Sequence, residues 1–126
     1  MKIKLTTNDA PKIIASLKAK SLKGKVQVEG KVVYDAEHAI FVHEDLEAEH
    51  PNGGQAKYLE QPAREYHRKY MDIVTSSIKN KNGLEEGVQR ALNALLEDSL
   101  PLVPVDTGEL YESGHVEMGE VTKVQA

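Results

Sequence analysis

The sequence contains no cysteine and no tryptophan, and its single phenylalanine is accompanied by five tyrosines. The lack of cysteine excludes disulfides, thiolate nucleophiles and cysteine-bound zinc, and it fits a reducing compartment. With so few aromatic rings, we expect an aliphatic core. No apolar run approaches the roughly 18 residues of a membrane span, and the start, MKIKLTTND, lacks the apolar region of a signal peptide.

What the sequence does contain is enough material for one domain with its own core, which we expect over residues 1–126. The net charge of −4 conceals a separation of charges. Residues 1–25 hold seven lysines and one aspartate, whereas residues 35–50 hold six acids and residues 97–120 seven, both without Lys or Arg. This pattern predicts surfaces of opposite sign that dock copies of the chain or a partner, the alternative being an ordinary solvated surface. The basic arm lacks interleaved aromatics, so we expect no sequence-specific nucleic-acid binding.

The first half of the sequence predicts strands around one short helix. A strand is expected at residues 2–6, and Pro11 suits the first turn of a helix that ends at Gly24. The apolar stripe of that helix consists of Ile13, Ile14, Leu17 and Leu22. From Lys25 the hydrophobic period changes to two, with Gly30 as a candidate β-bulge. Two strands are therefore expected, at residues 25–34 and 38–44, joined by residues 35–37 into a hairpin.

The second half predicts two long helices. Residues 47–57 form a loop with strong turn chemistry at Pro51-Asn52-Gly53-Gly54. A helix is expected over residues 59–79, with Ala63, Tyr66, Tyr70, Ile73, Val74 and Ile78 on one face. Another is expected over residues 84–100, with an apolar stripe of Leu84, Val88, Ala91, Leu92, Leu95, Leu96 and Leu100, ended by Pro101 and Pro104. Residues 115–124 alternate as a strand. The predicted fold is α+β, a small, mostly antiparallel sheet packed against two long helices.

Asp106-Thr107-Gly108 is the triplet of aspartic proteases, whose mechanism uses two carboxylates that share a proton. The residue that follows is Glu109, where a small residue is usual. Only 18 of the 126 residues come after Gly108, too few for the sheets and flap of a protease. We therefore predict that Asp106 caps a short helical turn and that Glu109 completes a capping box.

A second cluster has the residue types of a metal site: His38, His43, His50, Glu44, Asp45 and Glu47. On the predicted strand these side chains point to both faces, and no H-E-x-x-H motif occurs. We expect a structural role for His43, satisfied by a hydrogen bond. Residues 53–57 lack the spacing of a phosphate loop. The sequence therefore predicts no catalytic residue, no metal site and no cofactor, in a protein that is not an enzyme.

Two segments resemble a known family. The first is Tyr34-Asp35-x-x-His38-Ala39-Ile40-Phe41-Val42-His43-Glu44-Asp45-Leu46, followed by His50-Pro51 and by Gly54-Gln55-Ala56-Lys57-Tyr58-Leu59-Glu60-Gln61-Pro62-Ala63. The second is Val103-Pro104-Val105-Asp106-Thr107-Gly108-Glu109-Leu110-Tyr111-x-Ser113-Gly114. Together they are similar to small neck proteins of long-tailed bacteriophages, variously labelled minor capsid, head–tail connector or tail-completion proteins. In that family the D-T-G segment precedes the V-H-E-D segment, so the order here is reversed, as in a circular permutation.

The resemblance implies a structural protein of the virion, assembled in the host cytoplasm as a ring at the head–tail junction. Its implied partners are copies of itself, head-side connector or portal proteins, and tail terminator or tail-tube proteins, with no membrane. If the order is permuted, the strand after Ser113 is expected to lie beside the predicted hairpin. Two alternatives stay open: another virion component, on the capsid surface or associated with the tail tube, and a hydrolase of aspartic or metal-dependent type.

Overall fold

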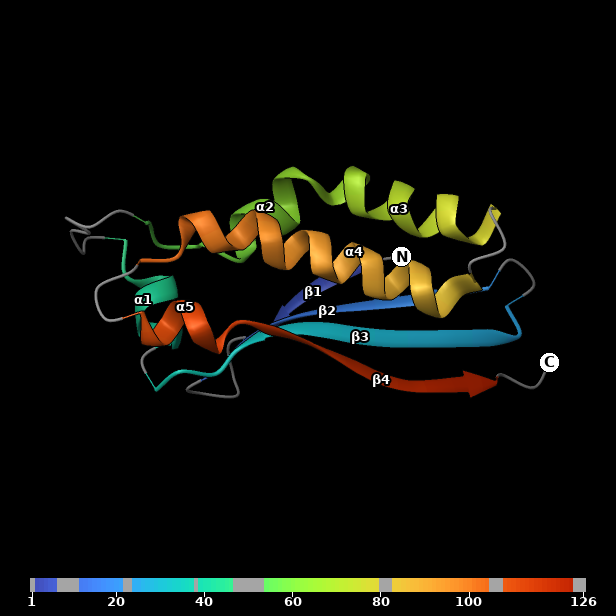
Figure 1. The fold of residues 1–126 in the computed structure, drawn as a ribbon, viewed down its shortest axis with the longest axis horizontal. Helices are drawn as coiled ribbons and strands as arrows, with labels where there is room; N and C mark the ends of the chain where they lie inside the picture. Colours follow the sequence, from blue (N-terminus) through green and yellow to red (C-terminus); the bar gives the residue numbers. More distant parts are fainter. Residues whose placement is uncertain are drawn as a thin grey trace.

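The computed structural model describes residues 2–6, 12–21, 24–37, 39–46, 54–79, 83–104 and 108–123. Four strands form one antiparallel sheet in the order β1-β2-β3-β4 (Figure 1): β1 (Lys2–Thr6), β2 (Ile13–Lys20), β3 (Val26–Tyr34) and β4 (His115–Lys123). Between β3 and β4 the chain forms α1 (Ala39–Glu44), α2 (Glu60–Glu65), α3 (His67–Lys79), α4 (Gly83–Ser99), a 3-10 helix η1 (Leu100–Leu102) and α5 (Glu109–Ser113). The expected α+β class is confirmed.

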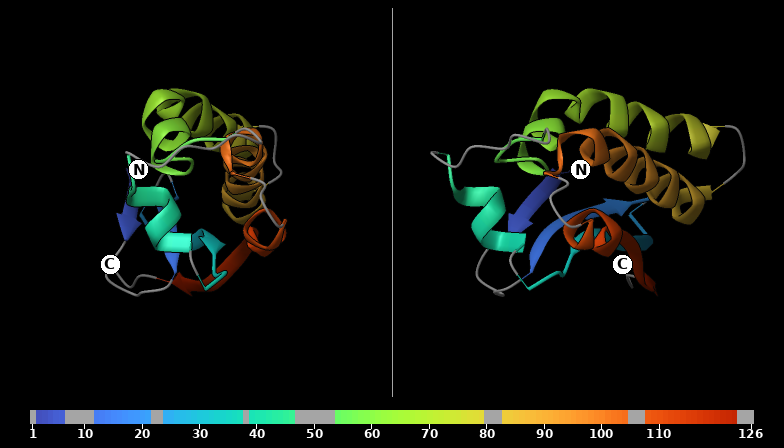
Figure 2. Two further views of the ribbon diagram at one scale, coloured as in Figure 1. Left: turned by 90° about the vertical axis from the view of Figure 1, so that its left-hand side faces the viewer. Right: turned by 60° about the vertical axis from the view of Figure 1, so that its left-hand side comes forward.

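The helices α2, α3 and α4 cover one face of the sheet (Figures 1 and 2). Helix α4 contacts β2, β3 and β4, and α3 packs alongside α4. The opposite face of the sheet, named the open face, presents Lys18, Lys20 and Glu29 as exposed side chains. Helices α1 and α5 lie at one end of the sheet, at the left of Figure 1. No helix within the described ranges is both long and apolar enough to cross a membrane.

The hydrophobic core lies between the sheet and α4. Every second residue of β2 and β3 points into it, as the period of a strand requires, and α4 contributes one face at helical spacing. The buried members of these three elements include Ile13, Ala15, Leu17, Ala19, Val28, Val32, Tyr34, Val88, Ala91, Leu92 and Leu95. Most are aliphatic, as expected, but three of the five tyrosines, Tyr34, Tyr58 and Tyr70, are also fully buried.

Residues 13–20, predicted as helical, form strand β2 instead. Ile13 and Leu17 fit both the four-residue spacing of a helix and the two-residue spacing of a strand, so the prediction rested on an ambiguous pair. Ala15 and Ala19 are buried between and beyond them, which only the strand period explains. Pairing with β1 on one side and β3 on the other overrides the local helical pattern.

Residues 39–44, predicted as part of a strand, form helix α1. Among the α1 residues whose side chains the structure describes, Ala39 and His43 are buried, and their spacing of four is that of one helix face. A turn in which the Ala39 amide donates to the Ala36 carbonyl at 3.0 Å leads into the helix. The predicted hairpin through residues 35–37 is therefore wrong, because β3 pairs with β2 and with β4.

The helix predicted over residues 59–79 is present as α2 and α3, since the backbone leaves the helical conformation at Tyr66 (φ −106°, ψ 22°). Ala63, Tyr70 and Val74 are buried as predicted. Tyr66 was also predicted on the buried face, but this prediction is wrong, because its side chain is 44% exposed at the break between the helices.

The remaining elements agree with the sequence within a residue or two: β1, β3, α4 and β4 occupy the predicted segments. The register between β3 and β4 shifts between Val28 and Gly30, so the irregularity expected at Gly30 is confirmed. Pro101 lies in η1, directly after α4. Pro11 and Leu22 of the predicted helix, and the loop residues 47–53, lie outside the described residues.

If α4 anchors the core, Leu95→Ala will lower the free energy of unfolding by about 2–5 kcal/mol, because it removes buried methyl groups and leaves a cavity. Leu95 is fully buried, whereas Asn93 on the same helix is exposed. Asn93→Ala is the matched control and should change stability by less than about 0.5 kcal/mol. Urea unfolding measures both, and equal effects of the two substitutions would contradict this packing.

Candidate functional site

The segments that carry the family resemblance meet at one end of the domain, where β3 ends and β4 begins (Figure 1). Four pieces of chain contribute: Tyr34 at the end of β3, helix α1, residues 54–63, and the described parts of the second segment, residues 102–104 and 108–114. The last piece is distant in the sequence from the other three, yet each of the four contacts at least one of the others. We call this region the motif end and describe its contacts in turn.

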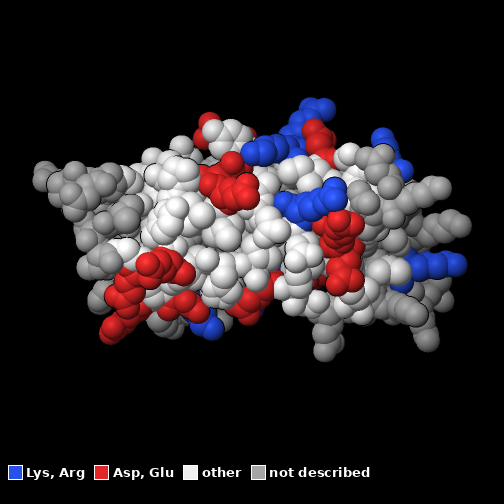
Figure 3. Space-filling view, in the orientation of Figure 1, with Lys and Arg blue, Asp and Glu red and all other residues white. Residues whose placement is uncertain are grey.

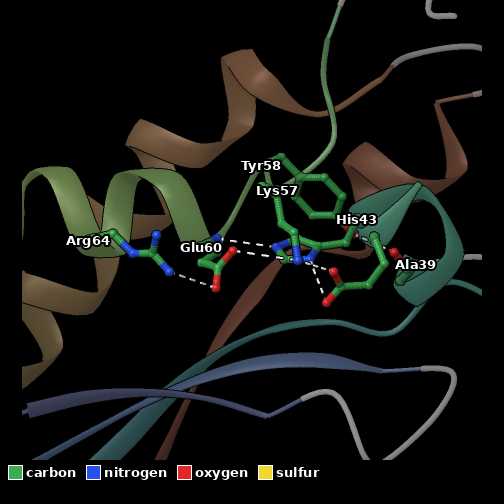
Figure 4. Close-up of polar contacts among 7 residues, drawn as sticks. Ala39, His43, Lys57, Tyr58, Glu60 and Arg64 are labelled. Carbon is green, nitrogen blue, oxygen red and sulfur yellow. Dashed lines mark hydrogen bonds and ion pairs between the residues drawn. The ribbon is translucent and has the colours of Figure 1, made fainter. Parts of the chain in front are cut away.

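Helix α1 is held to residues 57–60 by main-chain and side-chain hydrogen bonds (Figure 4). The Lys57 amide donates to the His43 carbonyl at 2.7 Å, and the Glu60 amide donates to Nε2 of the His43 ring at 3.2 Å. The Tyr58 hydroxyl donates to the Ala39 carbonyl at 2.9 Å. Both ends of α1 are therefore tied to one short segment, whose Lys57 adopts a left-handed conformation (φ 57°).

His43 is the central side chain of this contact. It is 1% exposed, and its ring packs edge-to-face on Tyr58 with centroids 4.8 Å apart. Because Nε2 accepts from Glu60, the neutral ring carries its proton on Nδ1. That atom makes no hydrogen bond within the described residues and lies 3.5 Å from Oε1 of Glu44, an electrostatic contact. The hydrogen bond predicted for His43 is present, at Nε2, and a purely structural role for this residue stays a prediction.

Charged side chains lie around the buried His43, nearer to the surface of the domain (Figure 4). The Lys57 ammonium pairs with Glu44 and lies 3.6 Å from Oε2 of Glu60, whose Oε1 accepts from Arg64 at 3.1 Å. Hydrogen bonding to Glu44 raises the pKa of Lys57. Partial burial alone would raise the pKa of Glu44, but Lys57 and His43 together lower it. The network thus fixes both charges and holds α1 to the start of α2.

An aromatic pair links the motif end to the core. The rings of Tyr34 and Tyr58 meet edge-to-face with centroids 5.0 Å apart. Ser99 donates to the Leu96 carbonyl at 2.8 Å, so the Tyr34 hydroxyl donates to the Ser99 oxygen, 2.6 Å away. Burial raises the pKa of Tyr34 to about 12, although this hydrogen bond opposes the shift. Tyr34 is therefore a neutral, buried side chain that links the sheet to α4.

Two glycines of the resembling segments sit where no side chain fits. A Cβ on Gly114 would lie 2.6 Å from Cε1 of Tyr34. A Cβ on Gly54 would lie 2.4 Å from the nitrogen of Pro104, and its φ of +92° also disfavours other residues. Beside it, the Gln55 amide donates to the Leu102 carbonyl at 2.7 Å. The glycine loop and the Val103-Pro104 segment are thus in direct contact.

The structure describes only part of the predicted cap of α5. The helix begins at Glu109, and the residue in the N-cap position is Gly108, with φ 78° and no side-chain cap. Asp106 and Thr107 lie outside the described residues, so the predicted cap at Asp106 stays a prediction. At the other end of α5, the Ser113 hydroxyl donates to the Leu110 carbonyl at 2.8 Å.

The other candidate residues do not form a chemical site within the described ranges. His38, Glu47, His50 and Gly53 lie outside those ranges. Among the residues that the structure does describe, no group of three or more His, Asp or Glu side chains could hold a metal ion. Lys57 is turned to Glu44 and Glu60 and is not free to hold a phosphate. What the motif end does is join four pieces of chain, and the absence of metal and catalysis stays a prediction.

Tyr34 was expected on the same strand face as Val28 and Val32, and it is buried there, but its contact with Tyr58 and its hydrogen bond with Ser99 were not predicted. The signal available for the tyrosines was their position within the resembling segments, beside Asp35 and Lys57. Ser99 carried no such signal, because its role depends on how closely the last turn of α4 approaches β3.

The charge separation of the sequence is retained in part, because Lys18 lies opposite Glu29 and Lys31 lies opposite Glu117 in the sheet. The exposed lysines of residues 1–25 include Lys4 on β1 and Lys18 and Lys20 on β2. Exposed acids of residues 97–120 include Glu112 on α5 and Glu117 on β4. Figure 3 shows Asp and Glu side chains gathered over the end where α5 lies. The lysines therefore lie toward the β1 edge of the sheet, and these acids toward the β4 edge.

No protein-family model, no curated protein and no solved structure matches the chain in the three comparisons.

Burial lowers the pKa of His43 below its ordinary 6.5, although Glu44 opposes the shift. Unfolding exposes this ring, so the unfolded chain takes up the proton first and the free energy of unfolding falls as the pH drops through about 6.5. His43→Gln, which keeps an acceptor for the Glu60 amide, should lose less stability than the wild type from about pH 7.5 to about pH 5.5.

His115 provides the matched control with the opposite sign. Its Nδ1 contacts the Ser113 carbonyl at 2.8 Å and its Nε2 contacts Glu117 at 2.9 Å. The hydrogen bond to Ser113 raises the pKa of His115. Glu117 acts in the same direction, and burial acts in the opposite one. His115→Gln should therefore steepen the acid loss of stability that His43→Gln reduces. Urea unfolding over the pH series tests both, and identical slopes in the three proteins would exclude this assignment.

Proposed function

We propose that this chain is a structural protein of a bacteriophage virion, which assembles as a ring at the head–tail junction between the head connector and the tail. The observation that carries the proposal is the convergence of the resembling segments at the motif end. The V-H-E-D segment supplies His43, the following segment supplies Lys57 and Glu60, and these residues contact each other directly.

The second resembling segment joins the same cluster. Gly114 packs against Tyr34, and Val103-Pro104 packs against Gly54. Segments that matched a family by chance would have no reason to meet in space. Their mutual packing supports the view that they are parts of one structural unit, with glycines where only glycine fits and buried rings between them.

The sheet also gives the reversed order a simple physical basis. In β3 and β4, Val26 lies opposite Lys123. A chain with the D-T-G segment first would pass from β4 directly into β3 through a turn at these two residues, and then into α1. A chain in that order could keep the pairing of β3 with β4, and this compatibility supports carrying the neck function over to this chain.

A ring requires a heterologous contact, in which one patch of a subunit meets a different patch of the next. Lys4 at the β1 edge and Glu117 at the β4 edge provide charges of opposite sign at opposite edges of the sheet. Part of the acidic segment is used within the domain, since Asp98 accepts from the Tyr70 hydroxyl at 2.7 Å and from Lys69 at 2.8 Å. Glu112 and Glu117 are exposed, and Glu117 also contacts Nε2 of His115 in its own chain at 2.9 Å.

Deleting the gene from the parent phage should leave filled heads and separate tails, because the ring that joins them is missing. Electron microscopy of the lysate shows this directly, and expression of the chain in trans should restore whole particles. Joined particles in the deletion would contradict the proposal. Intact heads joined to malformed tails, or capsids with altered surfaces, would instead favour the tail-tube or capsid alternatives.

Self-association should weaken as salt rises, since exposed charges are screened over about 8 Å at physiological salt. The variant Lys18→Glu with Lys20→Glu should associate less than the wild type while remaining folded, because opposite charges guide correct docking. Light scattering across a salt series measures both effects.

The matched control is Arg68→Glu with Lys79→Glu, which changes the net charge equally at exposed positions of α3. If the two double variants associate equally at every salt concentration, the basic face of β2 has no part in assembly. Circular dichroism confirms that each variant is folded.

A further inference from the structure

The sheet has two edges that no other described strand occupies. β1 pairs with β2 alone, and β4 pairs with β3 alone, within the ranges that the structure describes. An edge strand presents a row of N–H and C=O groups that can pair with another chain. Because all four strands alternate in direction, β1 and β4 run in opposite directions. A second copy placed with its β1 beside β4 would therefore continue the antiparallel sheet.

The side chains of the two edges match each other face by face. On the side of the helices, β1 presents Ile3 and Leu5, which lie opposite the buried Leu17 and Ala15. The helix side of β4 presents two half-buried residues, Val116 and Met118, opposite Val32 and Gly30. Both edges are thus apolar on the helix side and incompletely covered. A neighbouring edge would remove these apolar groups from water.

The open side of each edge carries charge of opposite sign. Lys4 is exposed on β1, and Glu117 is exposed on β4. Cross-strand pairs of opposite charge stabilise a sheet, and like charges destabilise it. The register that places Lys4 opposite Glu117 also places Ile3 opposite Met118 and Leu5 opposite Val116. A slip of one residue would set charged side chains against apolar ones.

A cleft beside β1 can receive the neighbour's apolar side chains. It measures about 290 Å³, and its walls include Ile3 and Leu5 of β1 and Ala63, Arg64 and His67 of the helical layer. In the same register, Val116 and Met118 of the next copy point to this side of the sheet, toward the cleft. The charge match and the face-by-face match of the two edges favour one occupant, a second copy of this chain.

We infer that copies of this chain join by antiparallel pairing of β4 of one copy with β1 of the next, Lys2–Thr6 aligned with His115–Gly119. The contact is heterologous, so repeating it builds a ring or a filament. Only the closure of this contact into a ring rests on the proposed function. The strand pairing itself rests on the two edges and their side chains.

The chain has no cysteine, so introduced thiols test the contact without background. The double variant Lys4→Cys with Glu117→Cys carries one thiol on each edge, and directly opposite Cβ atoms lie about 4.5–5.5 Å apart. A short bis-maleimide should convert it into a covalent ladder that extends beyond dimers on a denaturing gel. A mixture of the two single variants should stop at dimers, and neither single variant alone should crosslink.

The matched control is Lys20→Cys with Glu117→Cys, because Lys20 is exposed on the open face but belongs to the inner strand β2. It should give no ladder. Equal ladders in both double variants, dimers from Lys4→Cys alone, or no crosslink at all would each overturn the β4–β1 contact. A ladder from the predicted pair, together with joined particles after gene deletion, would keep the contact and reject the neck function.

Discussion

The motif end depends on keeping one buried histidine uncharged. His43 sits between the Tyr58 ring and the Glu60 amide, and its Nε2 can accept from that amide only when the ring is neutral. This contact holds α1 against the start of α2. Tyr58 in turn packs against Tyr34, which lies in the core. Protonation would place a positive charge on a ring that is buried away from water. Burial therefore lowers the pKa of His43, although the nearby carboxylates of Glu44 and Glu60 act in the opposite direction.

The sequence was informative where one period was unambiguous. The stripe of α4 repeats at helical spacing only, and β3 and β4 alternate over long segments, so these elements were predicted correctly. Residues 13–20 and 39–44 were not, because short apolar segments fit both periods. In the first case two neighbouring strands imposed the strand. In the second, burial of Ala39 and His43 on a single side imposed the helix.

The candidate site was predicted in part. His43 was correctly expected to make a hydrogen bond, but its partner, the Glu60 amide, lies 17 residues away and becomes adjacent only through the fold. The same holds for Ser99, 65 residues from Tyr34. The edges of the sheet were hidden for a related reason. With β2 taken as a helix and α1 as a strand, the order of strands, and hence which strands are outermost, could not be derived.

A reconstruction of whole particles by electron cryomicroscopy would show whether this chain forms the ring that we propose at the head–tail junction. We expect a closed ring of copies of this chain between the head connector and the tail, with β4 of each copy beside β1 of the next. Density for the chain along the tail tube or on the capsid surface, or particles that lack it, would exclude this position.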